Sequence, residues 1–168
     1  MKHFPEEQAW ATGIRGPLKL ADILYVARKA NRIAPLQVVR ADRVVGEAHV
    51  RSAARHAMRA RHEGRAAAQK PEVEFTRYLA GEKQILAAIE KMGVQDGCPA
   101  AVVVGLGAKG GDAIQYFLDQ LGLEVAELPA ADEDSLRRFG ITEQALGATT
   151  ADRRLDLVLE AVARVDAM

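Results

Sequence analysis

The segment PEVEFTRYLAGEKQILAAIEKMGV, residues 71–94, reads as two short helices that fold back on each other around one glycine. Pro71 suits the first position of a helix, because its missing N–H would have no partner there. Glu72 and Glu74 lie in the first turn, where the helix dipole favours acidic side chains. Gly81 can adopt the left-handed conformation that ends many helices, so the first helix is predicted to end there.

The second helix of this hairpin is predicted from helical spacing of its apolar residues. These residues recur at i, i+3, i+4 and i+7 and are Ile85, Ala88, Ile89 and Met92. Gly93 follows and can close the helix. Both helices therefore have a face to bury, and the turn between them presents a polar tip at residues 82–84.

Length and composition indicate one globular domain that spans residues 1–168. With 49% hydrophobic and 27% charged residues, the chain resembles ordinary soluble proteins. Its longest purely apolar run, residues 100–104, is far shorter than the roughly 20 residues that cross a bilayer. The first ten residues carry acids and a proline where a secretory signal would be apolar, and the single cysteine, Cys98, suits a reducing compartment. We expect a cytoplasmic protein.

The remaining elements predict an α/β fold. Strands are expected at residues 10–16 and 36–40, helices at 18–32 and 47–62, and an apolar amphipathic helix at 153–165. We expect a two-layer arrangement with a mixed sheet and helices packed on it.

Charge is distributed unevenly, although the net charge is zero. Residues 1–93 hold 17 Lys and Arg against 10 Asp and Glu, whereas residues 94–168 hold 6 against 13. The helix at 47–62 is the most basic element, and Arg51, Arg55 and Arg59 follow one another at spacings of four along one face. Two interpretations stay open: a solvated helix face whose charge attracts the acidic half, or a stripe that binds phosphate groups.

A glycine-rich segment raises a second functional hypothesis. GLGAKGGD at residues 105–112 stands between a predicted strand and a predicted helix, and Gly105, Gly107 and Gly110 match the G-x-G-x-x-G spacing of dinucleotide sites. Glu127 falls about where such sites place the acid that binds the ribose. The alternative is a glycine-rich loop after a buried strand, since the chain has few strands for a doubly wound nucleotide fold.

Other catalytic signatures are absent from the sequence. The two serines lie outside a G-x-S-x-G elbow, and Lys109 is followed by glycine rather than the Ser or Thr of a phosphate-binding P-loop. The histidines at 49, 56 and 62 lack the i, i+4 spacing of a helical metal site. We therefore expect no catalytic residues, no cofactor and no metal.

Several blocks together resemble one family, the accessory KEOPS subunits of the PRPK-binding protein (TPRKB) type. The blocks that carry the resemblance are ADRVVGEAHVRSAARHAMRA, EVEFTRYLAGEKQILAAIEKMGV, DSLRRFGITEQ and LDLVLEAVARVD. They occur in the family's order and cover most of the chain. The glycine-rich loop is where the chain departs from the plainer loop expected for the family.

The resemblance implies a non-enzymatic subunit of the complex that forms threonylcarbamoyladenosine (t6A) on tRNA. It implies two partners, the kinase-like ATPase subunit and the single-stranded 3′ CCA end of tRNA, and no membrane. Charge and resemblance together predict a tRNA-binding patch formed by Arg55, Arg59, Arg65, Lys70, Lys83 and Gln84. Tyr78 is a candidate for base stacking, with a buried role as the alternative.

Overall fold

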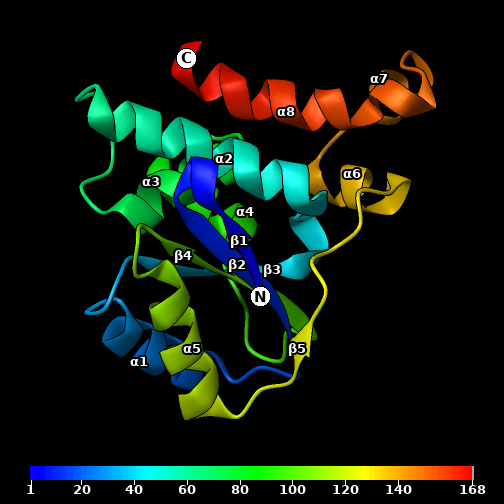
Figure 1. Ribbon diagram of the computed structural model, residues 1–168. Coiled ribbons are helices and arrows are strands. Elements are labelled where there is room, and N and C mark those ends of the chain that lie inside the picture. Colours follow the sequence, from blue (N-terminus) through cyan, green and yellow to red (C-terminus); the bar gives the residue numbers. More distant parts are fainter. Residues whose placement is uncertain (168) are drawn as a thin grey trace.

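The central feature of the computed structural model, which describes residues 1–167, is an open five-stranded sheet (Figure 1). Its strands are β1 (Lys2–Phe4), β2 (Ala9–Arg15), β3 (Leu36–Arg40), β4 (Ala100–Leu106) and β5 (Val125–Ala126). They are arranged in the order β1-β2-β4-β3, and β5 pairs with the end of β2 beyond β1. Every one of these strand pairs is antiparallel.

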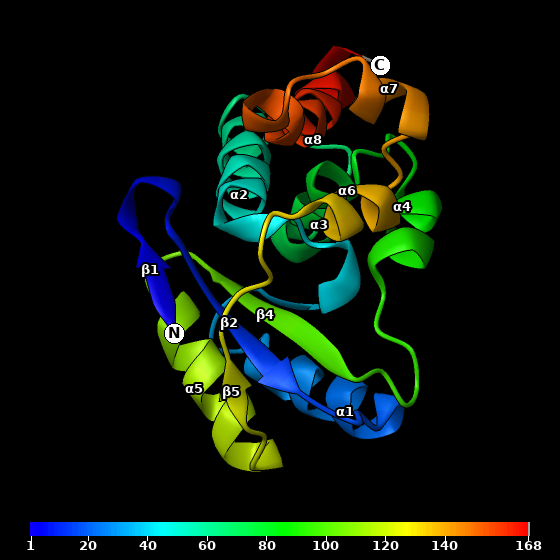
Figure 2. The ribbon, with the colours of Figure 1, turned by 90° about the vertical axis from the view of Figure 1, so that its right-hand side faces the viewer.

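Helices cover both faces of the sheet (Figure 2). The α-helices are α1 (Leu20–Ala30), α2 (Gly46–His62), α3 (Pro71–Ala80), α4 (Ile85–Met92), α5 (Gly110–Leu121), α6 (Glu133–Phe139), α7 (Glu143–Gly147) and α8 (Arg154–Arg164). Short 3-10 helices lie at η1 (Pro5–Glu7), η2 (Ala41–Arg43), η3 (Ala151–Arg153) and η4 (Val165–Ala167). None of the helices within residues 1–167 has both the length and the apolar character needed to cross a membrane.

The strands supply one buried core on each side of the sheet, because successive side chains of a strand point to opposite faces. In β4, Val102 and Val104 pack with α2, α3 and α4, whereas Ala101 and Val103 pack with α1 and α5. A smaller cluster joins α6, α7 and α8 above α2. The α/β class is therefore confirmed, but the sheet differs from the expected mixed, two-layer form because its pairings are antiparallel and both of its faces are covered.

The α3–α4 hairpin has the predicted boundaries. Helix α3 begins at Pro71 and ends at Gly81, which has a left-handed φ of 66°. Ala88 and Met92 of α4 are fully buried, as the apolar spacing predicts. Ile89, however, is 43% exposed, so only part of the predicted apolar stripe faces the core.

A buried histidine joins α2 to α3. The Nδ1 atom of His49 accepts a hydrogen bond from the N–H of Val45 at 2.9 Å, so Nε2 carries the proton and donates to the carbonyl of Leu79 at 2.7 Å. Burial lowers the pKa of His49 to about 4, so the ring is neutral near pH 7. His49 therefore serves as a fixed contact that places the start of α2 beside the end of α3.

Close packing explains the glycines at the end of β4 and the start of α5. A β-carbon added at Gly105 would overlap the carbonyl oxygen of Gly110, and one added at Gly110 would lie 2.6 Å from Gly105. Gly111 packs against the ring of Trp10 in the same way. The glycines therefore let α5 approach the end of β4 and the face of β2.

We expect Gly105→Ala to lower the free energy of unfolding by about 1–3 kcal/mol, because the added methyl group has no room between β4 and α5. Gly147→Ala is the matched control, since a β-carbon at Gly147 meets no atom within 4 Å. Denaturant unfolding of both variants measures the difference. Equal stability of the two variants would contradict the packing role of Gly105.

Candidate functional site

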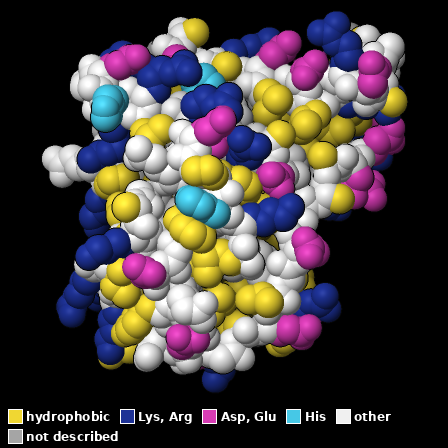
Figure 3. Space-filling model, viewed as in Figure 1, with side chains coloured by type: hydrophobic (Ala, Val, Ile, Leu, Met, Phe, Trp, Pro, Cys, Tyr) yellow, Lys and Arg dark blue, Asp and Glu magenta, His cyan; other side chains and the backbone are white. Residues whose placement is uncertain are grey.

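The end of α2 and the connection to α3 carry a group of cationic side chains, which we term the α2 basic surface. Its members are all exposed and are Arg55, Arg59, Arg61, Arg65 and Lys70. Arg61 Nη1 donates to the carbonyl of Gln69 at 3.0 Å, which holds the last turn of α2 beside the start of α3. Figure 3 shows Lys and Arg side chains over this end of α2, with Asp and Glu side chains among them.

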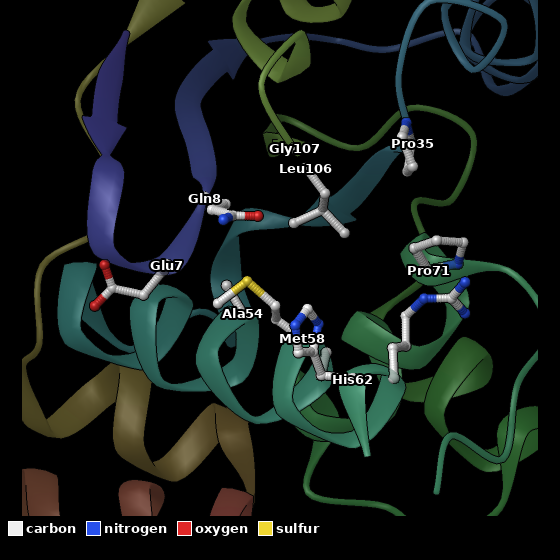
Figure 4. Close-up of a pocket in the computed structure, with 11 residues that line it drawn as sticks. Glu7, Gln8, Pro35, Ala54, Met58, His62, Pro71, Leu106 and Gly107 are labelled. Atoms are coloured by element: carbon white, nitrogen blue, oxygen red, sulfur yellow. The ribbon is translucent and has the colours of Figure 1, made fainter. Parts of the chain in front are cut away.

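An apolar cavity of about 240 Å³ opens beside this surface. Ala54, Ala57 and Met58 form its α2 wall, with Arg61 and His62 at the following turn. The other walls come from separate segments and include Pro35, Pro71, Leu106 and Gly107. In Figure 4, Leu106, Pro35 and Pro71 lie across the cavity from Met58 and His62. Apolar walls and a cationic rim suit a flat ring that is attached to a phosphate.

Arg55 is engaged with a buried acid of η1. Its Nη2 atom donates to Glu7 Oε1 at 2.8 Å, and Arg51 Nε donates to the same oxygen at 3.1 Å. The Glu7 side chain has no exposed area. Burial alone would raise the pKa of Glu7, but the hydrogen bonds from Arg55 and Arg51 outweigh it and hold the pKa below its usual value of 4.5.

Arg65 is engaged with acids as well. It donates to Glu63 Oε2 at 2.6 Å and to Asp166 Oδ1 at 3.0 Å. Asp166 also accepts from the hydroxyl of Tyr78 at 2.5 Å and lies 3.0 Å from His56 Nδ1. Asp166 thereby ties the end of the chain to α2 and α3, and part of the predicted attraction between basic and acidic halves is realised here.

Arg59 and Lys70 differ from Arg55 and Arg65 in their partners. Neither makes an ion pair or a side-chain hydrogen bond with any residue in the range 1–167. Arg59 lies one helical turn after Arg55, and Lys70 stands immediately before α3. Arg61 has no acidic partner in residues 1–167 either, since its side chain is bound only to the carbonyl of Gln69. An incoming anion therefore meets Arg59, Arg61 and Lys70 without displacing an acid of the described chain.

Lys83 and Gln84 lie away from the α2 basic surface. They are exposed at the tip between α3 and α4, whereas Lys70 is at the opposite end of α3, and the ten residues of α3 span about 15 Å. The bond between His49 and Leu79 places this tip near the start of α2. The structure therefore brings together Arg55, Arg59, Arg65 and Lys70 but separates Lys83 and Gln84 from them. The role of these six residues in binding tRNA stays a prediction.

Tyr78 belongs to the core. It is 2% exposed, its ring stacks on His56, and its hydroxyl is bound to Asp166. Burial, with the Asp166 contact, raises its pKa to about 12. The stacking role considered for Tyr78 is therefore wrong, and the buried alternative holds.

The sequence did not reveal the cavity, because its walls come from five separate segments of the chain, at residues 7–8, 35, 54–62, 71 and 106–107. Met58 and His62 gave no signal beyond their place on the basic helix. Arg61 could have been found, since it follows Arg59 on the same exposed end of α2. In the sequence, Pro35 and Pro71 indicated only where helices and strands begin or end.

The strand order does not fit a dinucleotide site at the glycine-rich loop. Such sites lie where parallel strands diverge, whereas β4 is antiparallel to both of its neighbours, β2 and β3. Glu127 lines a different cavity, with Met1, Lys2 and Thr12. The cavity next to Gly107 is smaller than the roughly 300–1,000 Å³ of typical cofactor pockets, so it suits one ring rather than a dinucleotide. Within residues 1–167 no group of three or more His, Cys, Asp or Glu side chains is placed to hold a metal ion.

An exposed cationic surface beside an apolar cavity is characteristic of proteins that bind other macromolecules. The comparison with protein families identifies the class more closely. The model of the kinase binding protein CGI-121 family matches residues 19–122, which is more than half of the chain, and the protein belongs to this family. This is the family of the PRPK-binding protein, so the resemblance noted in the sequence is confirmed. A comparison with curated proteins finds no match to the chain.

The ion pairs of Glu7 predict how stability depends on pH. Because the pKa of Glu7 is lowered in the folded state, its contribution is present above pH 4.5 and is lost as the pH falls through the lowered value. We therefore expect Glu7→Gln to lower the melting temperature near neutral pH, and we expect the gap from the wild type to close in acid. Thermal melts over a pH series measure this gap.

Glu6→Gln is the control for this prediction, because Glu6 is exposed and lies 3.8 Å from Arg51. Such a surface pair contributes little, so Glu6→Gln should melt like the wild type at every pH. A gap for Glu7→Gln that stays constant in acid would show that the carboxylate charge is not what stabilises η1 against α2.

Proposed function

We propose that the protein is a non-catalytic, cytoplasmic KEOPS subunit that binds the kinase-like ATPase of the complex and the 3′ CCA end of tRNA. In this role it supports t6A formation without a cofactor of its own. Membership of a kinase-binding family supports the protein partner. The RNA partner rests on one observation, the apolar cavity that opens within the α2 basic surface.

A single-stranded RNA end needs both parts of this arrangement. Its phosphates must be neutralised, and its unpaired bases gain free energy by leaving water for a ring-sized apolar site. The cavity, of about 240 Å³, is large enough for a single base, which matches a ligand that inserts one terminal base. Arg61 and His62 at its rim are placed to meet the phosphate on the 5′ side of that base.

The cations of this surface contribute unequally. Arg59, Arg61 and Lys70 carry charges that no acid in residues 1–167 balances through an ion pair, so they provide most of the attraction for phosphate. Arg55 and Arg65 already bind Glu7 and Asp166, and a phosphate must share their guanidinium groups. Binding should therefore depend on salt through few phosphate contacts rather than through the full count of arginines.

The first experiment is a binding titration of intact tRNA and of tRNA that lacks the terminal CCA. We expect the intact tRNA to bind more tightly, and we expect Met58→Trp, which fills the cavity, to remove the difference. Met58→Leu keeps the cavity open and should bind like the wild type. Equal affinity of the wild-type protein for both tRNAs would overturn the proposed RNA function.

The second experiment tests the charge of the α2 basic surface. We expect Arg59→Glu to weaken tRNA binding and to lower the slope of log K against log salt by about 0.7 for each lost phosphate contact. Arg28→Glu makes the same charge change on α1, away from α2, and serves as the control. If both variants lose affinity equally, net charge rather than this surface attracts the RNA.

A further inference from the structure

A second cavity, of about 290 Å³, forms a groove between α1 and α4 at the free edge of the sheet. Its banks are apolar, with Leu20, Leu24 and Ala27 on α1 and Ile89 and Met92 on α4. Its floor is strand β3, at residues 37–39. Helix α1 covers one face of the sheet and α4 the other, so the groove follows the sheet edge between them.

Large apolar side chains stand exposed along both banks. Leu24 is 56% exposed on α1, and Ile89 is 43% exposed on α4. Leu86, one turn before Ile89, is 75% exposed. Exposure of leucine side chains to water is unfavourable in free energy. A cluster of exposed apolar side chains along two neighbouring helices marks an interaction surface. Arg28, Lys83 and Glu90 lie within one turn of these leucines and supply a polar rim.

The sheet edge in this groove is closed to strand addition. The side chain of Asn31 accepts from the N–H of Leu36 and donates to its carbonyl, both at 3.0 Å. Gln37 Oε1 accepts the N–H of Val38 at 3.1 Å. The polar groups that an added strand would need are therefore taken, and a partner must bind the groove through side chains.

The family match indicates which kind of partner the groove binds. The property that names the family must be carried by the matched region, residues 19–122, which holds α1 to α5 and leaves out β1, β2, β5 and α6 to α8. Within that region, the outer face of α2 is cationic, and the exposed residues of α5 include Asp112, Gln115, Asp119 and Gln120. Apart from the α2 cavity, which has a cationic rim, the groove between α1 and α4 is the apolar hollow of the matched region beside which large side chains such as Leu24 and Ile89 are exposed.

We infer that this groove is the docking surface for the kinase-like ATPase subunit. The partner inserts apolar side chains between Leu24 of α1 and Ile89 of α4, covers Leu86 one turn before Ile89, and makes no strand pairing with β3. This inference rests on the kinase-like partner of the proposed function but not on tRNA binding. The groove and the α2 cavity have no lining residue in common, so each can be disabled separately.

The test measures the affinity of the purified kinase-like ATPase subunit for Leu24→Asp and Leu86→Asp, one variant from each bank. Both side chains are mostly exposed, so the fold tolerates the change. We expect each variant to bind the subunit about tenfold or more weakly than the wild type. Both should melt at the same temperature as the wild type, which shows that the fold is unaffected.

Val125→Asp is the matched control, because Val125 is 51% exposed on β5, outside the matched region. It should bind the kinase-like subunit normally. Normal binding by both leucine variants would overturn the inference, as would loss of binding by Val125→Asp alone. The inference would also be overturned if the wild type is a dimer in solution that Leu86→Asp turns into a monomer while binding to the kinase-like subunit stays unchanged. That result would assign the groove to a second copy of the chain.

Discussion

The close packing of α2 on α3 is the constraint on which the other features of this protein depend. Helix α2 faces the core through small residues that are almost fully buried, namely Ala53, Ala54, Ala57 and Ala60. Small side chains let two helices approach closely, and the larger Phe75 and Leu79 of α3 fill the space between them. His49 fixes the contact at one end through the Leu79 carbonyl. The long side chains of α2 are consequently left on its outer side, where most of them are arginine.

The same alanines account for the cavity beside the basic surface. Ala54 and Ala57 form one wall of it because a methyl group reaches too short a distance to fill the space toward Pro35 and Leu106. The cavity and the positive charge at this end of α2 therefore have the same origin, namely the alanines that face the core and the arginines left on the outer side. Glu7 and Asp166 then set the strength of the charge, since each engages one arginine of the α2 basic surface and leaves Arg59 and Lys70 without an acidic partner among residues 1–167.

Local signals predicted the helices of the hairpin well but not how the elements meet. Pro71 and Gly81 fixed the limits of α3 because their backbone restrictions act within one turn. The direction of the hairpin against α2 depends on contacts between distant residues, and the tip with Lys83 was for that reason expected too near the α2 basic surface. Likewise, the spacing of Gly105 and Gly110 serves close packing, which a spacing rule does not distinguish from nucleotide binding. Part of the apolar stripe of α4 was expected in the core, and Ile89 faces the groove instead.

Two surfaces with different chemistry thus lie on one rigid unit formed by β3 and α3. Pro35 and Pro71 border the cavity, whereas Gln37 and Thr76 border the groove. A hydrogen bond of 2.8 Å between Gln37 Nε2 and Thr76 Oγ1 joins the strand to the helix between the two sites. The two sites have no lining residue in common, so a substitution in the lining of one leaves the lining of the other unchanged. In the proposed function, β3 and α3 together carry both binding sites, which is the arrangement that a subunit connecting an RNA end and a protein partner requires.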